Sequence, residues 1–75
     1  MENKDQLNME IVFKVTESDL GGFSAHAIGH SIFTEGEDWQ DLKTMIRDAV
    51  LCHFERADIP SIARLKYERE ETITI

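Results

Sequence analysis

The chain has 75 residues, with one cysteine, one proline and no apolar run long enough to cross a membrane. Because Cys52 is alone, no disulfide can form within the chain, and no Cys and His spacing matches a zinc finger. The first residues also lack the apolar segment of a signal peptide. These absences predict a cytoplasmic protein without a disulfide or a membrane-spanning helix.

Basic residues are also scarce, since eight Lys and Arg face fifteen Asp and Glu, for a formal charge of −7. Direct DNA binding needs cations that displace counterions from phosphates, so it is disfavoured. An acidic surface suits a basic protein partner, and it also serves plain solubility. A chain this short has a marginal core, and small domains without disulfides or metals often self-associate. We therefore expect a homo-oligomer.

Apolar and polar residues alternate from Leu7 to Thr16, which predicts a strand with one buried face. Its inward residues are Leu7, Met9, Ile11, Phe13 and Val15. The preceding residues 1–6 are polar and are expected to be flexible, which leaves 7–75 as a single domain. A turn follows the strand, and Gly21 and Gly22 in it supply positive φ.

Two further strands are predicted over Phe23–Ile28 and Ser31–Glu35. A helix is then predicted over Trp39–Arg56, with Asp38 as N-cap and Asp41 as its capping-box partner. Its apolar stripe comprises Trp39, Leu42, Met45, Ile46, Ala49, Val50, His53 and Ala57. This stripe is expected to pack on the inward face of the first strand.

Strand character returns after Pro60, where Ala63, Leu65 and Tyr67 alternate with charged residues. The β-branched segment Thr72–Ile75 reads as a continuation of this strand or as a fifth one. The predicted fold is therefore α+β: a three-stranded antiparallel sheet, one amphipathic helix packed on it, and then a C-terminal strand.

No catalytic, cofactor-binding or metal-binding residue is predicted. His53 falls within the apolar helix stripe and is expected to be a core histidine rather than a general base. His26 and His30 are separated by a glycine bend, which disfavours a shared metal. Cys52 lies at the negative end of the helix without an adjacent cation, and is interpreted as a small apolar residue rather than a nucleophile.

Four acidic residues form a candidate set of magnesium ligands: Glu17, Asp19, Glu37 and Asp38. Their places in a turn and at a helix start favour ordinary structural roles instead. The pair Gly21 and Gly22 lacks the helix and lysine of a phosphate-binding loop. We therefore predict that the chain is not an enzyme. Candidate protein-interface residues are Leu51, Phe54, Ile73 and Ile75.

Three segments carry a resemblance to the N-terminal domain of HicB-like antitoxins: Phe13-x-Val15, Gly21-Gly22-Phe23-x-Ala25 and Phe33-Thr34-x-Gly36. The resemblance implies a fold that is similar to part of ribonuclease H. It also implies a non-enzymatic antitoxin or protein-interaction module that occludes a small basic ribonuclease toxin. The sequence departs from these antitoxins at Ala27–His30, where they usually carry Asp-x-Pro-Gly. We do not expect the operator-binding function of the longer members, which continue into a DNA-binding segment.

The segments Gly22–Gly36 and Asp48–Phe54 also resemble small stand-alone bacterial and archaeal proteins, often labelled a beta subunit of 2-oxoisovalerate dehydrogenase. A thiamine-dependent subunit needs a large α/β domain, and nothing in this sequence binds the cofactor. The dehydrogenase label is therefore not supported by the sequence. The alternative to an antitoxin is a stand-alone homo-oligomeric domain that has no toxin.

Overall fold

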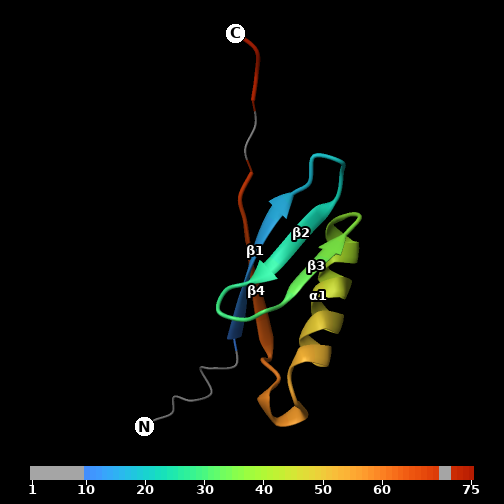
Figure 1. The fold of residues 1–75 in the computed structure, drawn as a ribbon, viewed down its shortest axis with the longest axis vertical. Helices are drawn as coiled ribbons and strands as arrows, with labels where there is room; N and C mark the ends of the chain where they lie inside the picture. Colours follow the sequence, from blue (N-terminus) through green and yellow to red (C-terminus); the bar gives the residue numbers. More distant parts are fainter. Residues whose placement is uncertain (1–9, 70–71) are drawn as a thin grey trace.

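A computed structural model describes residues 10–69 and 72–75. The chain forms a sheet with one helix packed against it, as Figure 1 shows. In order, the elements are β1 (Glu10–Glu17), β2 (Phe23–Ala27), β3 (Phe33–Gly36), α1 (Trp39–His53), the short 3-10 helix η2 (Arg56–Asp58) and β4 (Ile62–Tyr67). This order confirms the predicted α+β fold and its β-β-β-α-β succession.

The sheet is mixed and has the strand order β3-β2-β1-β4. β1 pairs with β2, and β2 with β3, in antiparallel fashion, whereas β4 pairs with β1 in parallel. The prediction of a three-stranded antiparallel sheet with a separate last strand was therefore incomplete. The cause is α1, a crossover that returns the chain to its starting end, so that β4 runs alongside β1 in the same direction.

The core lies between the sheet and α1, as the two apolar stripes predict. Ile11, Phe13 and Val15 of β1 are buried, and so are Leu42, Ile46 and Val50 of α1. Ala25, Ala27 and Ile32 complete the buried set. The predicted inward residues Leu7 and Met9 lie outside the described residues.

Two glycines, Gly22 in the turn before β2 and Gly36 at the end of β3, are required by close packing. A Cβ on Gly36 would lie 2.4 Å from the backbone nitrogen of Leu42. A Cβ on Gly22, which has a φ of +84°, would lie 2.7 Å from the carbonyl oxygen of Gly36. The glycines that carry the family resemblance therefore let β2, β3 and the first turn of α1 approach one another.

The predicted helix start is confirmed. An Asp38 carboxylate oxygen accepts a hydrogen bond from the backbone N–H of Asp41 at 2.8 Å. In return, the Asp41 carboxylate accepts from the backbone N–H of Glu37 at 2.9 Å. The two aspartates together satisfy free donors at the first turn.

The predicted helix end was wrong, because α1 stops at His53 rather than Arg56. Phe54 turns to an extended conformation, and its backbone N–H donates to the Val50 carbonyl oxygen at 3.2 Å. His53 and Ala57 are consequently exposed. The partly buried Ile59, which packs against the core, takes up the apolar role that the stripe assigned to this last turn.

The C-terminal prediction was also wrong for the tail, which is defined here as Thr72–Ile75. It is neither a continuation of β4, which ends at Tyr67, nor a fifth strand. All four tail residues are exposed, and the tail points away from the sheet in Figure 1.

Candidate protein-interaction surfaces

The structure brings two of the three histidines together at the end of α1. The ring of His30 lies 6.2 Å from that of His53 and 5.2 Å from that of Phe54, with both pairs edge to face. His26 instead pairs with Lys14 across β1 and β2. The prediction that His53 is a core histidine was therefore wrong. His53 is the last residue of α1, and its side chain is exposed rather than packed in the core. No set of three or more His, Cys, Asp or Glu suited to a metal occurs in residues 10–69 and 72–75.

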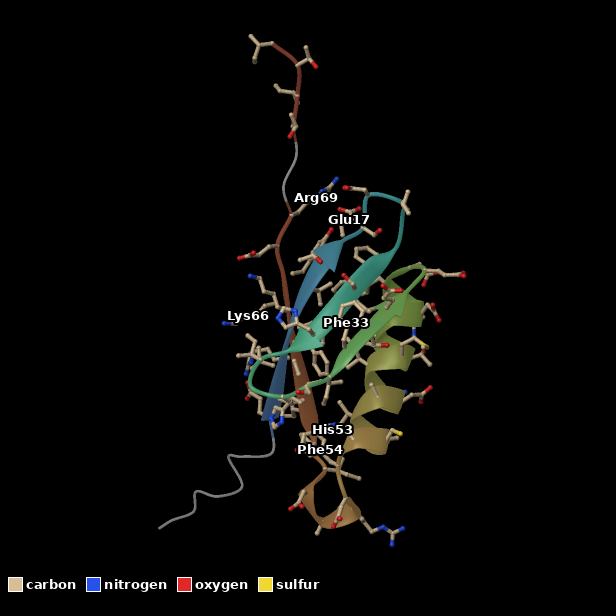
Figure 2. All side chains as sticks on the ribbon, in the orientation of Figure 1. Glu17, Phe33, His53, Phe54, Lys66 and Arg69 are labelled. Atoms are coloured by element: carbon tan, nitrogen blue, oxygen red, sulfur yellow. The ribbon has the colours of Figure 1, made fainter. Side chains whose placement is uncertain are left out.

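Acidic side chains gather at one end of the molecule, around two solvent-open hollows. One hollow, of about 500 Å³, is lined by Glu35, Glu37 and Asp41. The other, of about 640 Å³, is lined by Glu17, Asp19, Glu68 and Arg69. We call these carboxylates the acidic end: Glu17, Asp19, Glu35, Glu37, Asp41 and Glu68. Glu17 and Arg69 mark this end in Figure 2.

An aromatic cluster supports the acidic end. The ring of Phe23 lies 5.5 Å from that of Trp39 and 5.7 Å from that of Tyr67. The Tyr67 hydroxyl donates a hydrogen bond to a Glu17 carboxylate oxygen at 3.1 Å. Partial burial raises the pKa of Tyr67, and the bond to Glu17 raises it further. The phenol therefore stays protonated as a donor that orients the Glu17 carboxylate.

The acidic residues differ in what they contact. Asp41 caps α1 and Glu17 accepts from Tyr67, so both have structural partners. The carboxylates of Asp19, Glu35 and Glu37 make no ion pair within the described part of the chain. These three side chains are exposed and uncompensated, and they can therefore receive cations from another molecule.

Basic side chains lie on the face of the sheet that α1 leaves open. Lys14 pairs with Lys66 across β1 and β4, and both are exposed. On the same face, Arg64 donates through two nitrogens to the Glu10 carboxylate. The hydrogen bond from Arg64 lowers the pKa of Glu10 more than burial raises it, and the charge of Arg64 adds a smaller lowering. These cations thus lie apart from the acidic end, where Arg69 is the cation that lines a hollow among the described residues.

The four predicted interface residues have different surroundings. Leu51 is 52% exposed, and Ile73 and Ile75 are 72% and 108% exposed. Phe54 does not form a surface with Leu51, because it is partly buried against the core. Figure 2 places it beside His53 at the lower end of α1.

Leu51 instead forms part of a groove that sequence reasoning missed. This groove, of about 420 Å³, runs between α1 and β4 and is lined mainly by apolar residues, among them Ile11, Val50, Leu51, Ile59, Ala63 and Leu65. α1 packs over β3 and β2, so the inner face of β4 stays uncovered. The only sequence signal was that Ala63, Leu65 and Tyr67 form a second apolar stripe for a single helix to cover.

Two curated relatives are similar to the chain. A UPF0150 protein of Archaeoglobus fulgidus is 45% identical over 53 residues, which cover 71% of this chain and 79% of the relative. A UPF0150 protein of Thermotoga maritima is 39% identical over 66 residues, which cover 88% of this chain and 93% of the relative. No protein-family model and no solved structure matches the chain. Among the described residues, no helix is long and apolar enough to span a membrane. On the strength of the two relatives, the chain belongs to the UPF0150 family.

Proposed function

We propose that the chain is a non-enzymatic, HicB-like antitoxin module that binds a small basic ribonuclease through its acidic end and occludes it. The observation that carries the proposal is the gathering of uncompensated carboxylates, above all Asp19, Glu35 and Glu37, around the two hollows. A ribonuclease needs Lys and Arg to hold RNA phosphates. Carboxylates at this end would pair with those same cations and so compete with RNA.

The electrostatics favour such a complex. A cluster of one charge steers a partner of opposite charge and raises the association rate. The hollows are wide enough to receive Lys or Arg side chains of the partner. The aromatic cluster and the capped start of α1 hold the surrounding backbone, so little ordering is required on binding.

The resemblance to HicB-like antitoxins supports the same proposal. Its glycines Gly22 and Gly36 lie where the close packing beside the acidic end requires them. The alternative is a stand-alone homo-oligomeric domain without a toxin, and the exposed isoleucines of the tail favour it. A dehydrogenase subunit has no support in the sequence or in the names of the relatives.

Charge reversal at the acidic end tests the proposal. The tagged wild-type chain, expressed in its native host, should capture a small basic protein that cleaves RNA once high salt has released it. The double variant Glu35→Lys and Glu37→Lys should capture at least tenfold less of it. Because both side chains are exposed, the fold should survive, which circular dichroism would show.

A matched control changes charge equally at the opposite end. Glu55→Lys and Asp58→Lys, both exposed beside η2, should leave capture unchanged. If no basic ribonuclease copurifies, or if both double variants lose it equally, the acidic end is not an antitoxin surface.

A further inference from the structure

The groove between α1 and β4 ends beside an open strand edge. Among the described residues, β4 is an edge strand that pairs with β1 on one side, so its other side presents unpaired N–H and C=O groups. On the inner face of β4, Ala63 is exposed and Leu65 is half-buried. A single added strand would therefore meet backbone partners at the edge and apolar side chains in the groove.

The tail has the composition of that missing strand. Thr72, Ile73, Thr74 and Ile75 are all β-branched, and the two isoleucines alternate with the threonines. As a strand, the tail would present both isoleucines on one face. Ile73 is 72% exposed and Ile75 is 108% exposed, so the chain by itself leaves this apolar surface in water.

A tail is poorly suited to fill the groove of its own copy. It leaves from the end of β4 at Tyr67, whereas the groove lies beside the start of β4 at Ile59 and Ala63. To return, the chain would have to reverse within Glu68-Arg69-Glu70-Glu71. That stretch holds no Gly, Pro, Asn or Asp, the residues that dominate tight turns.

We propose that the tail of each copy pairs antiparallel with β4 of a second copy, so that two chains form a reciprocal dimer. Residues directly opposite each other in an antiparallel pair share a face. Ile73 therefore sits opposite Leu65 of the other copy, and Ile75 opposite Ala63, with both isoleucines in the groove. The small side chain of Ala63 leaves room for the terminal isoleucine. One two-fold axis satisfies both tails, which closes the assembly at two chains.

Sedimentation of the full chain tests the occupant of the groove. Wild type should be a dimer at tens of micromolar, and Ile73→Asp with Ile75→Asp should raise the dissociation constant at least tenfold. Thr74→Asp is the matched control, because it adds charge to the tail on the opposite face and should leave the dimer intact. A wild-type monomer at hundreds of micromolar, or a dimer that persists in the double variant, would refute the proposal.

Paired cysteines test the register. In a Cys52→Ser background, Leu65→Cys with Ile73→Cys should give a disulfide-linked dimer on mild oxidation. Arg64→Cys with Ile73→Cys should not, since these residues would face opposite sides of the sheet. A monomer that carries an internal disulfide would show a hairpin within one copy and would overturn the proposal.

The dependence of binding on salt concentration distinguishes this dimer from the proposed antitoxin complex. The register draws the two acidic ends towards each other, so added salt should screen their repulsion and tighten the dimer. Binding of a basic partner should weaken under the same conditions. A dimer that dissociates as salt rises would contradict the proposed arrangement, whatever the result of the capture experiment.

Discussion

Gly36 shows how one residue can constrain the packing of three elements. It ends β3 two residues before the cap of α1, and its missing side chain is what lets the backbone of Leu42 come close. Gly22 fits against its carbonyl oxygen from the neighbouring turn. Both glycines are needed because they have no side chain to clash with the neighbouring backbone. Of the two, only Gly22 also has a positive φ.

Gly36→Ala should therefore be strongly destabilising. The added Cβ would lie 2.4 Å from the Leu42 nitrogen, so β3 and α1 would have to move apart. We expect a loss of about 3 kcal/mol, the upper end of what overpacking costs. Gly21→Ala is the comparison, because it has open space and only the φ of +98° to oppose it; it should cost about 1 kcal/mol. Urea unfolding measures both, and equal losses would argue against the steric role of Gly36.

The pair of Glu10 and Arg64 gives stability a local dependence on pH. Its hydrogen bond lowers the pKa of folded Glu10 below the ordinary value of 4.5. On acidification the unfolded chain takes up this proton first, so the stabilisation is present above 4.5 and disappears as pH falls through the folded pKa. The coupling in a double-mutant cycle of Glu10→Gln and Arg64→Gln should be favourable at neutral pH and vanish in strong acid. A coupling that stayed constant across this range would exclude the ion pair as its source.

At the scale of elements, α1 divides its apolar residues between the core and the groove. Leu42 is fully buried over the sheet, whereas Leu51, nine positions later, is 52% exposed at the groove. The two leucines have the same side chain on the same helix. They therefore provide a direct comparison of the two surfaces.

Leu42→Ala should lower the free energy of unfolding by about 2–5 kcal/mol, the usual cost of a core truncation. Leu51→Ala should change it by less than about 0.5 kcal/mol, as at most exposed positions. Both are measured by urea unfolding at concentrations low enough to keep the chain monomeric. Similar losses for both would mean that α1 faces the sheet differently.

At the scale of the whole molecule, the acidic end, the cations of the sheet and the mainly apolar groove, which Lys43 and Arg47 also line, are found in different places. Carboxylates surround the hollows at the acidic end, cations line the open face of β1 and β4, and the apolar groove lies towards the other end of α1. The molecule thus offers two surfaces of different chemistry. One suits a basic protein, and the other suits an apolar strand.

We predict that the purified chain is not an enzyme. It should show no decarboxylation of branched 2-oxoacids with thiamine diphosphate, and it should leave RNA intact in magnesium or manganese. The physical reason is that its acidic side chains cap a helix, accept from Tyr67 or face solvent. Turnover that disappears in Asp19→Ala or His53→Ala would contradict this prediction.

The sequence by itself determined which faces of β1 and α1 turn towards the core and which turn towards water. The alternation in β1 identified its buried residues, and the stripe of α1 contained its three buried residues, because burial on one face imposes a period that can be read directly. The stripe was too wide, however, since its members Trp39 and Met45 are exposed. The same holds for the start of α1, since Asp38 and Asp41 act on backbone groups next to them in the chain. Such features depend on near neighbours alone.

Only the tertiary structure decided the direction of β4, the groove beneath it and the exposure of His53. An apolar stripe predicts that its residues pack against other apolar residues, but it does not predict which element supplies them. One helix is too narrow to cover four strands. Because α1 packs over β2 and β3, Leu65 of β4 remains half-buried. The acidic end likewise combines Asp19, from the turn after β1, with Glu35 of β3. Distances between segments set these features, and no single segment contains them.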